Sequence, residues 1–328
     1  MLEIAVLGAG RIGRIHAGNI AAHPGARLAG IADTDPAAAS GLADALGTRV
    51  LRLDDATRAD ALVICSPTPT HADYIEQAAA QGRPVFCEKP IDLSAARVRP
   101  CLAAVHQAGV TLMVGFNRRF DPHFAALKAR LDAGEIGRLE LLTIISRDPS
   151  PPPISYVASS GGLFRDMMIH DLDMARFLLE EEPVSVSAAA SCLIDPAIGA
   201  AGDVDTAVVT LRTASGRLCQ ISNSRRATYG YDQRIEAHGA AGMLRSGNVF
   251  PTTVQLADAQ GFRSNPVLPS FLDRYAAAYR AELSAFIDAI SEGVAIQPNG
   301  EDGLRALLLA DAAVEAAATG RAVQPAAV

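Results

Sequence analysis

The sequence contains no tryptophan, and aromatic residues make up only 5% of its 328 residues. Because hydrophobic residues still account for 49% of the chain, the interior must be built mainly from alanine, valine, leucine and isoleucine. A chain of this length exceeds the usual size of one compact domain. We therefore expect two domains with separate cores.

Cysteines are few, and none of the usual cysteine motifs occurs. The five cysteines form no Cys-x-x-Cys pair, and their odd number argues against a disulfide framework and against a zinc ribbon. We expect them to be small buried hydrophobic residues. The N-terminus enters a strand pattern at once, without the features of a secretory signal, and no apolar run approaches the length of a membrane span. These absences predict a cytoplasmic protein with no membrane partner.

Basic residues are scarce relative to acidic ones. The chain has 29 Lys and Arg against 36 Asp and Glu, which gives a formal charge of −7. The closest approach to a basic cluster is two isolated pairs, Arg118-Arg119 and Arg225-Arg226, which we interpret as residues on a solvated edge. Without clustered positive charge, the sequence predicts no nucleic-acid partner.

The first part of the chain alternates between strand and helix patterns. Short apolar runs lie near residues 3–7, 27–32, 60–65, 84–88 and 111–114, with a weaker one near 49–51. Helical patterns between them lie near 12–22, 36–46, 70–81 and 94–108. This alternation is typical of βαβ units on a parallel sheet. It predicts an α/β Rossmann domain over residues 1–120.

The pattern changes after residue 120. Helices are indicated near 122–134 and 162–180, and long strand-type runs near 138–146, 183–194, 204–213, 217–225 and 232–238. Turns such as Ala214-Ser215-Gly216 join consecutive runs, so we predict an α+β domain over residues 121–328 with a largely antiparallel open sheet. Helices near 270–292 and 301–319 end the chain and can pack back on the first domain. The Pro-rich stretch 148–153 is predicted to form a loop over a cleft.

A glycine motif lies between the first strand and the first helix. Its residues are Gly8-Ala9-Gly10-Arg11-Ile12-Gly13, which fit G-x-G-x-x-G in the context that predicts a dinucleotide site. The first glycine permits a tight turn, the second lets the backbone approach a pyrophosphate, and the third lets helix and strand pack closely. The helix N-terminus, which contains Arg11 and Ile12, offers free N–H groups to the phosphates.

The end of the second strand carries a carboxylate. Asp33 stands about 20 residues beyond Gly13, where an acidic side chain can accept hydrogen bonds from the ribose hydroxyls and repel a 2′-phosphate. We therefore predict NAD rather than NADP as the cofactor. The alternative is that Asp33 is only a turn residue ahead of Thr34-Asp35-Pro36.

The third strand ends in a polar segment, Ser66-Pro67-Thr68-Pro69-Thr70-His71. Ligands bind at the carboxyl ends of strands in open α/β sheets, so we predict that Ser66, Thr68 and His71 contribute to the cofactor site. His71 can equally be a surface or packing residue. Thr70 has a simpler explanation as the cap of the helix that begins there.

Glu88 and Lys89 follow the fourth strand at the same edge of the sheet, directly before Pro90. We predict that both residues line the cofactor site. The proline keeps Lys89 extended rather than helical. A fixed ammonium there can hydrogen-bond a substrate hydroxyl and favour a developing alkoxide. The alternative is an ordinary solvated lysine at a strand end.

The helix predicted near 162–180 carries Asp166, His170 and Asp173 in one narrow stripe. A neutral imidazole is a suitable base near neutral pH, and a carboxylate one turn away can orient it. We predict that His170 takes a hydroxyl proton while a hydride leaves for a nicotinamide. The alternative is the wet face of an ordinary amphipathic helix. We predict no metal, because no second histidine or cysteine stands nearby as a zinc ligand.

Four segments together resemble the Gfo/Idh/MocA oxidoreductases nearly end to end. They are residues 8–13, 88–90, 115–121 and 166–173. Two longer strings, residues 161–176 and 229–234, look like the inositol-oxidising branch of that family.

The resemblance implies that Lys89, Asp166 and His170 form a catalytic trio in contact with substrate, with His170 as the acid/base and Asp166 as its partner. It further implies that Asp148 and either Tyr229 or Tyr231 contact the substrate. It also implies that the second-domain sheets pack into a homotetramer.

The implied reaction is oxidation of one ring hydroxyl of a cyclic polyol, most simply myo-inositol to 2-keto-myo-inositol. Some relatives carry asparagine where we align Asp148, so another inositol or a sugar is an alternative substrate. A non-catalytic NAD-binding sensor and an NAD-dependent glycosidase are alternatives of other classes. A sensor should lack the lysine, aspartate and histidine together, and all three are present here.

Overall fold

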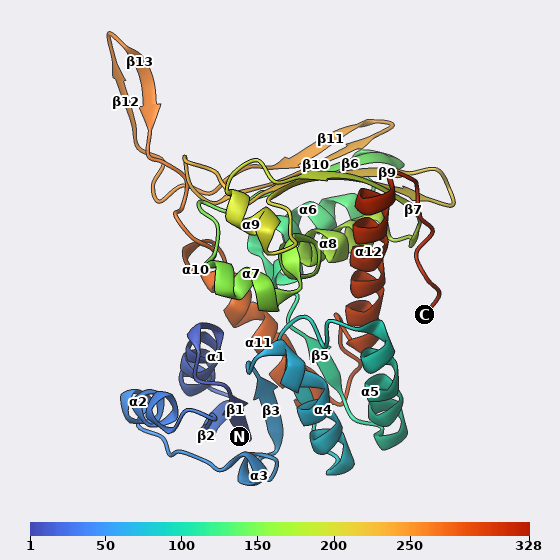
Figure 1. Ribbon diagram of the computed structural model, residues 1–328. Coiled ribbons are helices and arrows are strands. Elements are labelled where there is room, and N and C mark those ends of the chain that lie inside the picture. The colour runs from blue at the N-terminus through green and yellow to red at the C-terminus, as the bar shows by residue number, and fades with distance from the viewer. The chain divides into compact units, whose positions relative to one another are not determined.

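The computed structural model describes all residues from 1 to 328. Contacts between residues divide the chain into two compact units. The first comprises residues 1–120, 278–307 and 328, and the second comprises residues 121–277 and 308–327. Their helices and strands are labelled in Figure 1.

The first unit is built on a five-stranded sheet with the strand order β2-β1-β3-β4-β5. All neighbouring strands run parallel, which confirms the predicted Rossmann domain. Its strands are β1 (Leu2–Leu7), β2 (Ala26–Ala32), β3 (Ala61–Ile64), β4 (Val85–Cys87) and β5 (Leu112–Val114). Its helices from the first part of the chain are α1 (Arg11–Ala22), α2 (Pro36–Leu46), α3 (Leu53–Ala56), α4 (His71–Ala80) and α5 (Ala95–Ala108).

A helix from the far end of the chain completes the core of this unit. Helix α11 (Ala276–Glu292) contributes Leu283, Phe286 and Ile287 to the cluster formed by the strands and by α1 and α2. The strands are buried on both faces, as expected for a parallel sheet covered on each side.

The weak strand predicted near residues 49–51 is not formed. Val50 makes only an isolated parallel bridge to Ile31. Leu51 donates a backbone hydrogen bond to Ile31 at 2.8 Å, but the chain enters α3 at Leu53, so no longer ladder can develop.

The second unit contains a six-stranded sheet with the order β11-β10-β6-β9-β8-β7. Every neighbouring pair is antiparallel except β6 with β9, which confirms the largely antiparallel α+β domain. The strands are β6 (Leu139–Arg147), β7 (Pro183–Ser191), β8 (Thr206–Thr213), β9 (Leu218–Ser224), β10 (Asp232–Gly239) and β11 (Gly242–Ser246). The helices are α6 (Pro122–Asp132), α7 (Ile154–Ser160), α8 (Ile169–Leu179), α9 (Pro196–Ala200), α10 (Phe271–Arg274) and the second half of α12 (Gly300–Thr319).

Helices cover one face of this sheet, and α6 and α8 lie beneath it in Figure 1. Along β8 the buried Ala207, Val209 and Leu211 alternate with exposed residues, as a sheet with one covered face requires. An additional hairpin, β12 (Gln255–Asp258) and β13 (Gly261–Ser264), extends away from the sheet, and all its residues are exposed. None of the helices is long and apolar enough to cross a bilayer.

The helix predicted as continuous near 162–180 is interrupted. A π-helical turn spans Leu163–Met167, and α8 begins only at Ile169. Gly161 and Gly162 have φ values of 89° and 79°, which end α7, and the Met168 N–H bonds back to the Leu163 carbonyl at 2.9 Å. The wider turn shifts the angular spacing of the side chains, so the predicted stripe is not a stripe of one regular helix.

The interpretation of the arginine pairs as residues on a solvated edge is wrong for three of the four. Arg118, Arg119 and Arg225 are buried, and only Arg226 is exposed. Arg119 lies 3.1 Å from Asp302, and Arg225 lies 3.3 Å from Asp203. Charged side chains are buried where they find such partners, which the sequence places far away along the chain.

The cysteines are all free, and Cys87, Cys101 and Cys219 are buried as expected. Cys65 and Cys192 are partly exposed, so the prediction of burial is wrong for these two. Burial raises the pKa of the Cys101 thiol to about 12, which leaves it protonated and unreactive near neutral pH.

Candidate active site

The loop between β1 and α1 is shaped by its glycines. Gly8 has a φ of 103°, and a Cβ there would lie 2.5 Å from the carbonyl oxygen of Cys65. A Cβ at Gly13 would lie 1.9 Å from the carbonyl oxygen of Gly8. At Gly10, in contrast, no atom lies within 4 Å of the position that a Cβ would take. The first and third glycines are therefore needed for packing, whereas Gly10 leaves the backbone open to a ligand.

Helix α1 begins at this open backbone. Its N-cap is Gly10, and no side chain caps the N–H groups of the first turn. Arg11 is exposed and Ile12 is partly buried at the start of the helix. Uncapped N–H groups together with the helix dipole form a suitable site for an anion such as a pyrophosphate.

Both oxygens of the Asp33 carboxylate accept backbone hydrogen bonds. Its Oδ1 accepts a hydrogen bond from the Asp35 N–H at 2.8 Å, which forms the turn after β2. Its Oδ2 accepts one from the Ala9 N–H at 2.6 Å, which ties the carboxylate to the glycine loop. A carboxylate offers about four acceptor positions, so these two bonds leave capacity for ribose hydroxyls.

The segment after β3 is held by its own side chains. The hydroxyls of Ser66 and Thr70 lie 2.7 Å apart, and Thr70 also donates to the Pro67 carbonyl at 2.8 Å. Thr70 occupies the predicted N-cap position of α4, but its side chain makes no capping bond to the helix. The hydroxyl bonds to residues before it in the chain instead of to the helix, which begins directly after a 3-10 turn from Thr68 to Thr70.

His71 is buried, and both of its ring nitrogens face carbonyl oxygens. Its Nδ1 lies 2.8 Å from the Pro90 carbonyl oxygen, and its Nε2 lies 2.7 Å from the Ser66 carbonyl oxygen. The ring therefore connects the segment after β3 with the segment after β4. Burial lowers the pKa of His71, so the ring is neutral near neutral pH.

Glu88 and Lys89 follow β4 directly, and both are partly buried. An Oε1 of Glu88 lies 2.9 Å from Nε2 of His16, a fully buried histidine on α1. Gly115, at the end of β5, provides the space for this carboxylate, because a Cβ there would lie 3.1 Å from it. No local pattern in the sequence connects His16 with Glu88, because the two residues are far apart along the chain.

In the second unit, Asp166 lies in the π-helical turn and His170 lies in the first turn of α8. Both residues are partly buried. The Tyr156 hydroxyl on α7 donates to Oδ1 of Asp166 at 2.9 Å. Tyr156 was not among the predicted site residues. In the sequence it is only a lone aromatic residue shortly after the Pro-rich stretch.

The third member of the predicted stripe has a different environment. Asp173 is fully buried and lies 3.6 Å from Arg176, one turn later in α8. The neighbouring Asp171 is also buried and accepts a hydrogen bond from Asn223 of β9 at 2.9 Å. These two carboxylates connect α8 internally and to the sheet, so α8 is not an ordinary helix with a wet face.

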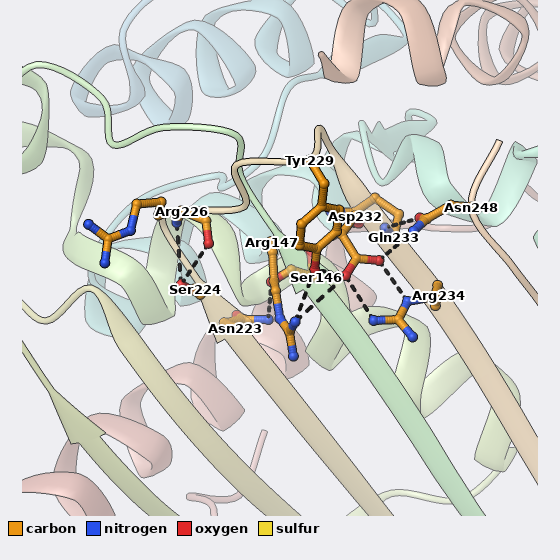
Figure 2. Close-up of polar contacts among 10 residues, drawn as sticks. All are labelled: Ser146, Arg147, Asn223, Ser224, Arg226, Tyr229, Asp232, Gln233, Arg234 and Asn248. Carbon is orange, nitrogen blue, oxygen red and sulfur yellow. Dashed lines mark hydrogen bonds and ion pairs between the residues drawn. The ribbon is translucent and has the colours of Figure 1, made fainter. Parts of the chain in front are cut away.

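The two candidate tyrosines lie on opposite sides of the sheet. Tyr229 is 46% exposed, and its hydroxyl donates to Asp232 at 2.6 Å and accepts from Arg147 at 3.0 Å (Figure 2). Tyr231 is 7% exposed, and its ring packs edge-on against Tyr275 at 6.0 Å. Alternation along β10 places Asp232 on one face and Gln233 on the other.

The side chains themselves identify which face adjoins α8. Asn223 bonds to Asp171 of α8, and Ser146 is its register partner on β6. The Ser146 hydroxyl donates to Gln233 at 3.0 Å, so Gln233 shares that face. Arg147 and Asp232 therefore lie on the opposite face, and Tyr229 is bonded there (Figure 2).

Asp232 is the centre of the polar group in Figure 2. It is fully buried and accepts hydrogen bonds from Arg234 at 2.7 and 2.8 Å and from Asn248 at 2.7 Å. Burial raises the pKa of Asp232, but the hydrogen bonds from Arg234, Tyr229 and Asn248 outweigh it and leave the pKa below its ordinary value. This group joins β6, β10 and the segment after β11. Asp148, just beyond β6, donates its backbone N–H to Ser224 at 3.0 Å.

Comparison with known proteins covers nearly the whole chain. Residues 2–116 match the oxidoreductase family with an NAD-binding Rossmann fold, and residues 124–245 match the GFO/IDH/MocA C-terminal domain. The inositol 2-dehydrogenase of Rhizobium meliloti is 54% identical over 325 residues, which are 98% of each protein. This chain belongs to the Gfo/Idh/MocA family.

Solved structures of similar sequence agree with this fold. A myo-inositol dehydrogenase from Corynebacterium glutamicum is 48% identical, with a TM-score of 0.96 over 100% of both chains. The scyllo-inositol dehydrogenase from Lactobacillus casei, solved with bound NAD(H) and scyllo-inositol, is 30% identical with a TM-score of 0.92, again over both complete chains. The present Gfo/Idh/MocA protein is an NAD-dependent oxidoreductase that acts on CH–OH groups.

Proposed function

We propose that this protein oxidises a ring hydroxyl of a cyclic polyol, and that its substrate is myo-inositol, which it converts to 2-keto-myo-inositol. Relatives that are 54% and 44% identical over 98% of this chain are named inositol 2-dehydrogenase and myo-inositol 2-dehydrogenase. The observation that carries the proposal is that Asp166 and His170 stand about one turn apart where the π turn passes into α8, with Asp166 bonded to Tyr156.

In this proposal His170 is the base that removes the proton from the reacting hydroxyl. A neutral imidazole accepts a proton readily near neutral pH, and Asp166 stabilises the imidazolium that results. Lys89 donates a hydrogen bond to the same oxygen and stabilises its alkoxide character. The carbon loses a hydride as the oxygen loses its proton, so that CH–OH becomes C=O.

NAD, when bound, accepts that hydride. The residues present suit this cofactor, because the backbone at Gly10 is open and the first turn of α1 is uncapped. We assign the pyrophosphate to the loop from Gly8 to Gly13 and the ribose hydroxyls to Asp33. Ser66 and Thr68 are better candidates for the nicotinamide side than His71, since both ring nitrogens of His71 already lie against carbonyl oxygens.

Substrate contacts are proposed from Asp148 and Tyr231. The face of the sheet that adjoins α8 also carries Ser146 and Gln233, and the hydroxyl of the neighbouring Tyr275 lies 3.2 Å from Gln233. Tyr229 is the weaker candidate, because its hydroxyl bonds to Arg147 and Asp232 on the opposite face.

The direct test is NADH formation with myo-inositol by the unmodified protein and by His170→Ala. Loss of the base should lower kcat by about 100- to 10,000-fold. His106→Ala, an exposed histidine near the end of α5, is a matched control and should turn over normally. Normal turnover by His170→Ala would remove this histidine from the mechanism.

A substrate panel separates the alternatives. Scyllo-inositol and simple aldoses test for a different preferred polyol, and one relative at 37% identity is named scyllo-inositol 2-dehydrogenase. A sensor would bind NAD without turnover of any polyol. An NAD-dependent glycosidase would release a sugar from a glycoside without net NADH.

We also propose that the exposed face of the six-stranded sheet forms the contact between subunits of a homotetramer. On this face Leu141, Leu218 and Met243 are 39%, 40% and 46% exposed. Leu141 is the register partner of Leu218 and of His238, which in turn pairs with Met243, so the three apolar side chains stand in one row. Such a row on an open sheet is typical of a subunit contact.

Light scattering should give a tetramer, which Leu218→Glu dissociates. A monomer for the unmodified protein would contradict this assembly.

We place the protein in the cytoplasm. This location is supported by the five cysteines, which are all free, as in proteins of reducing compartments. Immunodetection after cell fractionation tests this location.

A further inference from the structure

A buried polar cluster lies beside Lys89 in the first unit and takes no part in the proposed proton and hydride transfer. It consists of His16 on α1, Glu88 after β4 and Glu282 on α11. One side-chain nitrogen or oxygen of each lies within 4.8 Å of the others. Apolar residues of the same volume often stabilise a fold as well as buried ionisable groups do. Space filling alone therefore does not account for this cluster.

His16 is the donor of the cluster. Its Nε2 lies 2.9 Å from Oε1 of Glu88, and because a carboxylate only accepts, that nitrogen carries the proton. The ring is fully buried and packs between the rings of Phe86 at 4.8 Å and Tyr279 at 5.7 Å. The contacts of the ring determine where its N–H points.

Glu282 is the least expected member. It is fully buried, neither of its carboxyl oxygens makes a hydrogen bond, and the nearest cation-forming group is His16 at 4.0 Å. Burial and the nearby Glu88 raise the pKa of Glu282 well above its ordinary value. A neutral acid here avoids placing two carboxylates side by side without a counter-charge.

Both chain neighbours of Lys89 lie against histidine side chains. On one side His16 holds the side chain of Glu88, whose N–H also donates to the Ile64 carbonyl at 2.9 Å. On the other side Nδ1 of His71 lies 2.8 Å from the Pro90 carbonyl oxygen. The backbone from which the Lys89 side chain extends is therefore restrained at both ends.

We propose that His16 and Glu282 are positioning residues, which hold the Glu88 carboxylate in one orientation and thereby direct the side chain of Lys89. His16 supplies the hydrogen bond, and the neutral Glu282 closes the space behind Glu88 without repelling it. The inference rests on the proposed function, since it concerns the placement of the lysine that binds the reacting oxygen.

The test compares three variants of the complete protein. His16→Phe keeps a ring between Phe86 and Tyr279 but removes the donor, so kcat for inositol oxidation should fall by about tenfold to 100-fold. The dissociation constant for NAD should change by less than about threefold, because the glycine loop is untouched. His16→Gln restores an N–H donor and should recover most of the lost kcat. Glu282→Gln has the shape of the neutral acid and should retain kcat within about threefold.

Several results would overturn the proposal. One is unaltered kcat in a folded His16→Phe variant. Another is an equal loss in His16→Phe and His16→Gln, which would mean that only ring packing matters. A loss of kcat in folded Glu282→Gln as large as in His16→Phe would show that the acid must be ionised. Should His16→Phe fail to fold, Glu88→Met, which removes the acceptor of the His16 N–H, takes its place, and normal kcat in that variant would likewise overturn the proposal.

Lys89→Met separates this inference from the proposed function. If Lys89→Met turns over normally, the role proposed for the lysine is wrong. If Lys89→Met is inactive while His16→Phe behaves like the unmodified protein, only the positioning role is wrong.

Discussion

The backbone N–H of Ala9 donates a hydrogen bond to the carboxylate of Asp33 at 2.6 Å. Ala9 lies within the glycine loop and Asp33 follows β2, so the loop assigned to the pyrophosphate is bonded directly to the group assigned to the ribose. A 2′-phosphate on the ribose would meet a negative charge that this bond holds in place.

Replacing that charge should alter the choice of cofactor. We expect Asp33→Ser to lower the ratio of kcat/KM for NAD over kcat/KM for NADP by about tenfold or more, since repulsion of the 2′-phosphate is lost. Asp35→Ala is the control, because Asp35 caps α2 through the Ala37 N–H at 2.9 Å and should affect stability without altering the ratio. An unchanged ratio in Asp33→Ser would contradict the assignment.

The glycine loop allows binding and folding to be tested separately. Gly13→Ala would place its Cβ 1.9 Å from the Gly8 carbonyl oxygen, so we expect the first unit to lose its native fold or much of its thermal stability. Gly10→Ala meets no atom within 4 Å, so the protein should fold normally yet bind NAD at least about tenfold more weakly. Calorimetry measures both effects. Tight NAD binding by Gly10→Ala would argue against a close approach of the pyrophosphate at this loop.

Glu282 should make stability depend on pH with a definite sign. The ordinary pKa of a glutamate is 4.5, and burial together with Glu88 raises that of Glu282 well above it in the folded state. Between the two values the folded protein holds more protons than the unfolded chain, so the free energy of unfolding falls as pH rises. Below 4.5 this loss is absent.

Glu282→Gln lacks this titration. We expect its free energy of unfolding, relative to that of the unmodified protein, to increase steadily as the pH is raised above about 5. Urea unfolding at a series of pH values measures the difference. Parallel curves for the two proteins would show that Glu282 has no raised pKa.

A buried ion pair anchors α6 in the second unit. Asp121 caps this helix by accepting from the N–H groups of His123 and Phe124, both at 3.1 Å, and Arg274 donates to its two oxygens, one of them at 3.0 Å. Arg274→Met would leave a buried carboxylate without its partner, which should cost about 3–5 kcal/mol of stability. Arg130→Met breaks the exposed pair with Glu135 and should leave the urea midpoint almost unchanged. Equal effects of the two substitutions would contradict this account.

Local patterns in the sequence were sufficient for the five strands and the glycine loop of the first unit, but not for the contribution of α11 to its core. Its five parallel strands follow from short apolar runs between helical patterns, and the dinucleotide loop follows from three glycines at a strand–helix junction. Asp33 could be assigned because its distance from Gly13 along the chain reflects the length of one βαβ unit. Each of these inferences depends on residues that are close in sequence.

Contacts between distant segments decided the rest. Tyr156 on Asp166, Asp203 beside Arg225, and Glu282 beside His16 and Glu88 have no local signal, because each side chain finds its partner through the tertiary fold. Helical and strand periodicities also did not predict the π turn at Leu163–Met167. Nor did they predict that Tyr229 and Tyr231 lie on different faces of the sheet.

The sequence by itself therefore determined the secondary structure of the cofactor unit, the chemistry available to the protein and its family. Only the tertiary structure decided which charged groups are buried, which partners they have, and which face of the sheet each polar residue occupies. The physical reason is that periodicity and turn geometry are properties of neighbouring residues, whereas desolvation and hydrogen bonding depend on everything that packs around a side chain.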